Sequence, residues 1–219
     1  MTAPAATMGS MAEPQTSYRQ ATRELLRETV FKAARVLLES QPWSEITMGD
    51  IATEAGVSRQ TLYNEFGSRN EFGLALVLHE AGNFLEGVEA AIRAKADDPR
   101  GAIEVALEQF LVVAGQDPMI AVLLSDDGTG GMLPFVTTRA VPMIAWVSDR
   151  IGSVIVETWP RMGAEDAGLI AENLVRLAIS YVTAPTEPRE ATVARVNRLI
   201  GPFIDQALAQ STVSADERT

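Results

Sequence analysis

The sequence predicts an all-α protein with a small N-terminal head and a larger helical body. Apolar residues recur at spacings of three and four along most of the chain, which is the period of an amphipathic helix. No stretch alternates apolar and polar residues as a half-buried strand would. Helix caps and Gly or Pro breaks fall between the periodic segments. These three observations agree on the fold class.

Length and composition fit this organisation. The 219 residues are 47% hydrophobic, enough for a sizeable core, and the absence of Cys excludes disulfides, thiolate metal sites and thiol nucleophiles. We expect residues 1–17 and 211–219 to be flexible tails, residues 18–67 to be the head, and residues 68–210 to be the body. No apolar run approaches the roughly 18 residues of a membrane span, and the first residues do not resemble a signal peptide, so we expect a cytoplasmic protein.

The head contains the clearest local signals. Thr47 precedes an apolar-periodic run and Asp50 follows three residues later, which predicts a capping box. The helix over 48–55 then meets Gly56, the residue that best tolerates a positive φ. Ser58 is expected to cap a second short helix, which Gly67 closes.

The second short helix has an open side. Leu62 and Phe66 are expected to face the core, which leaves the polar side chains outside: Arg59, Gln60, Thr61, Tyr63 and Asn64. Two short helices joined by a tight turn form a helix-turn-helix, whose second helix enters a DNA major groove. The segment therefore predicts DNA binding.

The formal net charge of −11 does not exclude DNA, because the acidity lies in the body. Residues 1–70 hold 7 Lys and Arg against 8 Asp and Glu, whereas residues 71–219 hold 11 against 21. Phosphate binding depends on local charge and on helix N-termini. The acidic body is expected to weaken non-specific binding and to add to its salt sensitivity.

The body reads as a series of helices. Ser68 and Glu71 repeat the capping pattern, Asp97-Asp98-Pro99 and Asp117-Pro118 break and restart the chain, and 125–134 is a Gly- and Asp-rich loop. These signals place helices over about 68–94, 99–114, 118–124, 141–159, 165–183 and 191–210.

A dense set of residues links the head to a known family. It comprises an amphipathic first helix followed by Trp43, Ile46-Thr47, Ile51-Ala52, Ala55-Gly56-Val57-Ser58, Thr61-Leu62-Tyr63, Phe66 and Ser68-Arg69. On these residues, the segment from about Arg19 to Leu76 resembles the DNA-binding head of the TetR family of bacterial transcriptional regulators. Glu65 stands where that family often has His, and Arg69 where Lys is more usual. We expect Glu65 to face away from DNA or to pair with Arg69.

The resemblance implies a ligand-responsive regulator, most simply a homodimeric repressor of a palindromic operator that a hydrophobic small molecule releases. Thr47, Ser58 and Arg69 are expected to hold phosphates. Gln60 and Thr61, with Arg59, are expected to approach base edges. The complete expected DNA site is Thr47, Ser58, Arg59, Gln60, Thr61, Tyr63, Asn64 and Arg69.

Two late helices carry wide apolar faces, which are either monomer core or a dimer interface. A dimer places two recognition helices about 34–36 Å apart on successive turns of DNA. We favour the interface for the segment as a whole, as in the family that the chain resembles. The expected interface residues are Leu174, Leu177, Tyr181, Val196, Leu199 and Phe203.

Large apolar side chains in the middle of the body are each more typical of core than of a cavity. The resemblance nevertheless implies an inducer pocket there, and its lining suggests a hydrophobic or amphipathic ligand. The expected pocket residues are Phe84, Phe110, Met119, Leu123, Phe135, Arg139, Met143 and Trp146. Asn83 and His79 are further polar candidates, although His79 is more typical of a surface or helix-capping residue.

Other chemistries find little support. One His and no Cys leave no metal cluster at ligand spacing, so no metal or cofactor is expected, and Asp126-Asp127 is typical of a loop turn. The segment 127–131 lacks the Lys-Ser/Thr ending of a phosphate loop. No Ser-His-acid arrangement supports an enzyme. The rival function is a helical small-molecule-binding or interaction protein that retains the head only as structure.

Overall fold

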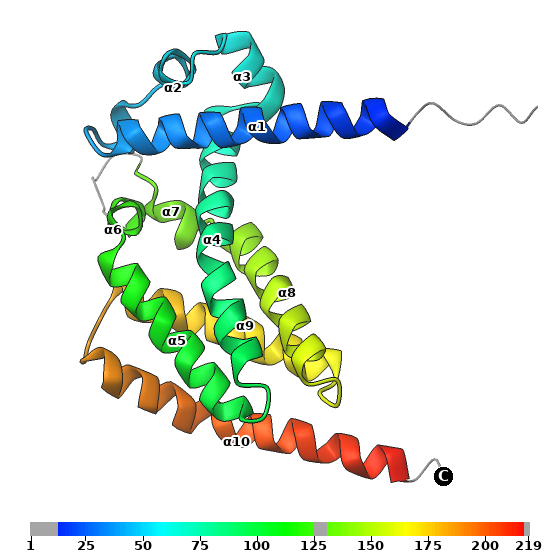
Figure 1. The fold of residues 1–219 in the computed structure, drawn as a ribbon. Helices are drawn as coiled ribbons and strands as arrows, with labels where there is room; N and C mark the ends of the chain where they lie inside the picture. The colour runs from blue at the N-terminus through cyan, green and yellow to red at the C-terminus, as the bar shows by residue number, and fades with distance from the viewer. Residues whose placement is uncertain (1–12, 125–130, 217–219) are drawn as a thin grey trace, which may run out of the picture.

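The computed structural model describes residues 13–124 and 131–216, and these residues form helices with no strand (Figure 1). The all-α prediction is confirmed. The head consists of α1 (Glu13–Leu38), the 3₁₀ helix η1 (Trp43–Glu45), α2 (Met48–Glu54) and α3 (Arg59–Phe66). The body consists of α4 (Arg69–Ala94), α5 (Pro99–Gln116), α6 (Pro118–Leu124), α7 (Leu133–Val136), α8 (Val141–Thr158), α9 (Ala164–Thr183) and α10 (Arg189–Asp216).

The helices at both ends are longer than expected. Helix α1 begins at Glu13 and α10 continues to Asp216, so residues 13–17 and 211–216 of the expected tails are helical. Pro14 suits the first turn of α1, and residues 211–216 contain no Gly or Pro to stop α10. Residues 1–12 and 217–219 lie outside the described part of the chain.

The loop expected over 125–134 ends two residues earlier than predicted, because α7 begins at Leu133 with Pro134 in its first turn. The expected Asp126-Asp127 turn and most of the Gly-rich segment lie outside the described residues. Pro occurs at the start of a helix as well as after its end. Pro134 therefore fits the expected loop as well, and the short helix α7 was not predicted.

Aromatic side chains join the head to the body. The ring of Phe72, on α4, is fully buried, with its centroid 5.0 Å from that of Phe66 and 5.9 Å from that of Phe31. Trp43 stacks on it with a centroid separation of 6.1 Å. Because α4 supplies the centre of this cluster, the head cannot move relative to α4 without breaking aromatic contacts.

Helix α4 descends from the head into the body, where it packs against α5 and α8 (Figure 1). Helix α8 packs closely on α9, since a Cβ on Gly152 would lie only 3.7 Å from the Cα of Gly168. Helix α10 crosses below and contacts α5 and α9. Within the described ranges, the helices are too short or too polar to cross a lipid bilayer.

Candidate DNA-binding surface and ligand pocket

The two short helices of the head are fixed by the expected caps. The Thr47 hydroxyl accepts a hydrogen bond from the Asp50 backbone N–H at 3.2 Å, and the Asp50 carboxylate accepts from the Thr47 N–H at 2.8 Å. The hydrogen bond from the Thr47 hydroxyl, followed by that from its backbone, lowers the pKa of Asp50. Gly56 has φ 68°, as the turn requires. The predicted capping box and turn are confirmed.

Ser58 caps α3 as predicted, because its hydroxyl accepts from the Thr61 N–H at 3.0 Å. Leu62 and Phe66 are buried on the inner side of α3. A second capping box at Ser68 starts α4. These local hydrogen bonds orient α3 so that its polar side faces away from the core.

The open side of α3 presents Arg59, Gln60, Tyr63 and Asn64, all of which are exposed. Their spacing of one, four and five positions places them on one helix face. Gln60, Tyr63 and Asn64 make no hydrogen bond through their side chains to other residues in the described part of the chain. The Arg59 guanidinium lies against Gly49 of α2, where any side chain would collide with it. Three of the eight expected DNA residues are therefore exposed and unengaged within the described ranges, and Arg59 is exposed but rests against α2.

The hydroxyls of the expected DNA site are engaged in caps. Thr61 and Ser58 share a hydrogen bond of 2.8 Å between their hydroxyls, and the Thr47 hydroxyl donates to Asp50 at 2.6 Å. All three residues lie at helix N-termini, where backbone N–H groups attract phosphate. A phosphate here would meet N–H groups and the helix dipole before any free hydroxyl.

Arg69, which was expected to hold a phosphate, is engaged within the head in this structure. Its Nε donates to the carbonyl of Ile46 at 2.9 Å, its Nη2 donates to the carbonyl of Trp43, and its guanidinium lies 4.4 Å from the Trp43 ring centroid. The carbonyls around η1 outcompete solvent for this cation. Arg69 therefore ties the start of α4 to the head core.

Glu65 faces away from the open side of α3, toward α1. It accepts hydrogen bonds of 2.8 Å from Arg23 Nε and Arg27 Nη1, whereas the alternative pairing with Arg69 is not formed. Its side chain is only 11% exposed. Burial alone would raise the pKa of Glu65, but the hydrogen bonds from Arg27 and Arg23 outweigh it and lower the pKa.

We expect Glu65→Gln to lower the free energy of unfolding by about 1–2 kcal/mol at neutral pH, because it uncouples α3 from two cations of α1. The folded-state pKa of Glu65 lies below the ordinary value of 4.5. The wild-type advantage is thus full above about pH 4.5 and disappears as pH falls through the folded pKa. Urea unfolding of both proteins at several pH values measures this; a difference that is independent of pH would contradict the assignment.

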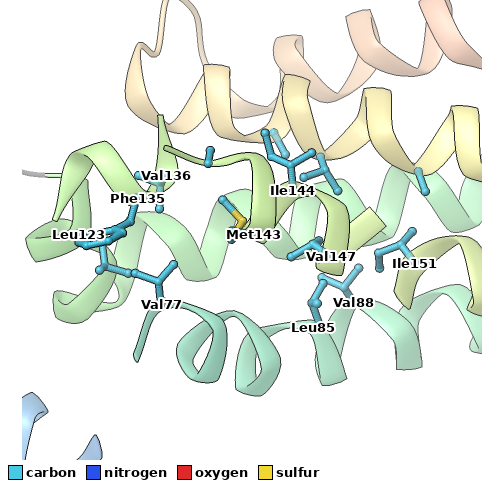
Figure 2. Packing of buried hydrophobic residues seen from close by; sticks show 14 of the residues in the cluster. Val77, Leu85, Val88, Leu123, Phe135, Val136, Met143, Ile144, Val147 and Ile151 are labelled. Carbon is cyan, nitrogen blue, oxygen red and sulfur yellow. The ribbon is translucent and has the colours of Figure 1, made fainter. Parts of the chain in front are cut away.

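A cavity of about 310 Å³, partly open to solvent, lies between α4, α5, α8 and α9, with α6 and α7 at the end nearest the head. Figure 2 shows Leu85 and Val88 of α4 facing Val147 and Ile151 of α8. The lining on α4 runs from Val77 to Ile92, about 22 Å at 1.5 Å per residue. The dimensions suit a narrow, chain-like ligand.

Half of the expected pocket residues line this cavity, namely Phe84, Phe110, Leu123 and Met143. The other four do not. Met119 is buried in the core, Phe135 packs against α4 at Gly73, and Arg139 is exposed. Trp146 is 36% exposed, with the Arg150 guanidinium 5.5 Å from its ring centroid. The pocket residues were predicted from their size and polarity, which do not show which face of a helix lines the cavity.

The prediction also missed lining residues on α4 and α9. Val77, Ala81 and Val88 follow one face of α4, at the same spacing as Phe84, and this periodicity could have identified them. Leu174, expected in a dimer interface, also lines the cavity. Helical periodicity alone does not distinguish a face toward a cavity from a face toward a partner.

The expected interface residues differ in exposure. Leu199 is 67% exposed, whereas Val196, three positions earlier, is 2% exposed and belongs to the monomer core. Leu177, Tyr181 and Phe203 are half-buried against that core. The interface prediction is therefore wrong for Val196. Helix α10 packs on α5, so one of its apolar rows must face the monomer core.

Charged groups gather at the end of the cavity nearest the head. Arg35 of α1 donates to Glu80 of α4 at 2.5 Å and to Asp117, after α5, at 3.0 Å, and all three residues line the cavity. Burial raises the pKa of Glu80, although Arg35 opposes the shift. His79 stacks on Phe31 at 4.5 Å and lies 3.5 Å from a carboxylate oxygen of Glu28, so it belongs to the contact between α1 and α4.

Two parts of the chain match known protein families. Residues 30–76 match the bacterial regulatory proteins of the tetR family, and residues 98–202 match the C-terminal domain of the bacterial tetracyclin repressor. The HTH-type transcriptional regulator AlkX of Mycobacterium tuberculosis is 34% identical over 206 residues, covering 94% of this chain and 97% of that protein. The HTH-type transcriptional regulator EthR of Mycolicibacterium smegmatis is 32% identical over 92 residues, 42% of each chain.

A solved structure agrees with these matches over nearly the whole length. The crystal structure of the TetR family repressor AlkX from Dietzia sp. strain DQ12-45-1b, a protein implicated in biodegradation of n-alkanes, superposes with a TM-score of 0.72 at 30% identity, covering 91% of this chain and 100% of that one. Sequence, fold and the capped recognition helix thus lead to one conclusion. The chain belongs to the TetR family, and it is a ligand-responsive, DNA-binding transcriptional regulator.

Proposed function

We propose that the protein is a repressor that binds a palindromic operator as a homodimer and is released when a hydrophobic or amphipathic small molecule fills the cavity. The observation that carries the proposal is the open face of α3, whose polar side chains are exposed. Arg59, Gln60, Tyr63 and Asn64 supply base contacts, with Gln60 and Asn64 suited to adenine and Arg59 to guanine.

Phosphate contacts position the head on the duplex. They come from the N-termini of α2 and α3, where Thr47, Ser58 and Thr61 lie. Arg69 contributes indirectly, because it holds the start of α4 against η1. In this arrangement the head needs little net positive charge.

Dimerisation supplies the second recognition helix. Leu199 is exposed on α10, and Leu177, Tyr181 and Phe203 are half-buried on α9 and α10, so a partner could cover all four. Two heads about 34–36 Å apart read two half-sites one helical turn apart.

The cavity's shape suggests the effector class. A lining about 22 Å long that is mostly aliphatic and aromatic accommodates a linear hydrocarbon chain. The link between the Dietzia repressor and biodegradation of n-alkanes supports an alkane-derived effector for this protein as well. We infer an effector with a single alkyl chain.

Helix α4 couples the two sites, since it supplies both the cavity wall and Phe72 of the head core. An effector shifts the population toward heads that are wrongly spaced for the operator, provided that it binds this state more tightly. The mechanism therefore depends on α4 changing its position relative to α5 and α8.

Selection of bound duplexes from a random DNA pool, at defined salt, tests the DNA-binding part. We expect an enriched palindrome with half-sites about one helical turn apart. No enrichment at low salt, from a folded dimer, would favour the rival in which the head is only structural.

The selected operator then tests the site. We expect Gln60→Ala with Tyr63→Ala to weaken operator binding by about 100-fold or more, because each lost base contact costs about 1–3 kcal/mol. Both side chains are exposed, so thermal stability and dimerisation should not change. Gln206→Ala, at an exposed position of α10, is the matched control. Normal operator binding by the double variant would show that another surface reads the DNA.

A further inference from the structure

One end of the otherwise apolar cavity is acidic. Among the lining residues that the structure describes, the charged ones are Arg35, Glu80 and Asp117, which together carry one net negative charge. Their lining neighbours are apolar, apart from Asn83 beside Glu80. A ligand that fills the cavity along α4 brings one of its ends to this cluster.

The cluster has an unused hydrogen-bond acceptor. Arg35 Nη1 bonds Glu80 through Oε2, while Oε1 has no hydrogen-bond partner in the described ranges. The Glu80 side chain is only 10% exposed. Asp117, by contrast, accepts from Arg35 and from the Met119 N–H at 2.7 Å. This oxygen of a mostly buried side chain is therefore available to a donor that enters the cavity.

We propose that the effector is a single-chain amphiphile whose head group donates a hydrogen bond and carries no negative charge, and that Glu80 and Asp117 determine this preference. The proposal rests on the proposed function of the cavity as the effector site. The chemistry is that of an alcohol or an amine at the end of an alkyl chain.

A carboxylate head group suits this end of the cavity poorly. It offers acceptors only, so it leaves Glu80 Oε1 without a donor. It also places a third anion beside a single guanidinium, in surroundings that screen charge weakly. Burial also raises the pKa of Glu80, because these surroundings stabilise its anion less well than water does. A hydroxyl donates to Glu80 and can accept from Arg35.

Arg35 connects the polar end of the effector to the DNA-binding head of the protein. Arg35 belongs to α1, and its two ion pairs join α1 to α4 and to the end of α5. A hydrogen bond from the effector to either partner competes with these contacts. The end of the ligand that determines specificity therefore lies where the head meets the body.

Binding of three probes with the same alkyl chain tests the proposal: decanol, decylamine and decanoate, each below its micelle-forming concentration. Their affinities are measured with the full-length protein by displacement of a fluorescent apolar dye. We expect decanol or decylamine to bind at least about tenfold more tightly than decanoate, equivalent to about 1.4 kcal/mol. In Glu80→Gln with Asp117→Asn, the preference against decanoate should disappear.

Glu86→Gln is the matched control, because Glu86 is an exposed residue of α4 outside the cavity, and it should keep the wild-type preference. If the double variant does not fold, Asp117→Asn alone should show part of the change. Decanoate binding as tightly as decanol and decylamine to the wild type would overturn the proposal. Failure of all three probes to displace the dye would instead refute the effector-site function on which it rests.

Discussion

Phe72→Ala is expected to lower the free energy of unfolding by about 3–5 kcal/mol, a large fraction of the stability of a typical domain. Phe72 is fully buried, and its ring contacts those of Phe31, Trp43 and Phe66. Truncation removes the side chain on which three head elements pack and leaves a void that the surrounding helices cannot close. Urea unfolding at a fixed protein concentration measures the loss, since dimerisation makes stability depend on concentration.

Phe84→Ala provides a matched control, because Phe84 is an aromatic residue of the same helix that borders the cavity. Its ring meets that of Phe110 edge to face at 4.9 Å, and one side of it is already unpacked. Its truncation should therefore cost clearly less than that of Phe72. Equal losses in the two variants would show that the aromatic cluster between the head and α4 is not a special point of stability.

The head could be predicted because its signals are local. Thr47 and Asp50 are three residues apart, Ser58 caps the helix that follows it, and Gly56 alone meets the positive φ of the turn. Such hydrogen bonds form within one helical turn and depend little on the rest of the chain. The open face of α3 follows directly, since burial of Leu62 and Phe66 fixes its rotation.

The cavity and its charged end could not be predicted in the same way. Arg35 and Asp117 are 82 positions apart, so no local pattern brings them together. Phe84 and Phe135 are both large apolar residues in the middle of the body, yet only Phe84 borders the cavity. The contacts of Arg69 could not be predicted from the sequence either, because a cation at a helix start suits a phosphate and a carbonyl equally well. Which partner it takes depends on the path of η1.

Ala106→Phe is expected to weaken effector binding by about 100-fold or more while operator affinity stays within about twofold. Ala106 is buried on the wall that α5 contributes to the cavity. A benzyl group at this position projects into a space of only about 310 Å³ and takes up room that the effector needs. The head is distant from the substitution, so its caps and aromatic cluster should remain unchanged. Dye displacement and operator binding measure the two effects on the same protein.

The separation of these two effects is what makes the variant informative. Overpacking of a filled core typically costs about 1–3 kcal/mol, whereas filling an existing void should leave thermal stability unchanged or raised. Ala90→Phe, at an exposed position of α4, controls for an added aromatic surface and should bind the dye normally. If Ala106→Phe destabilises the protein and still binds the dye, the cavity is ordinary core and the effector occupies another site. If it loses dye binding and still responds to an effector at the operator, the dye site and the regulatory site are different.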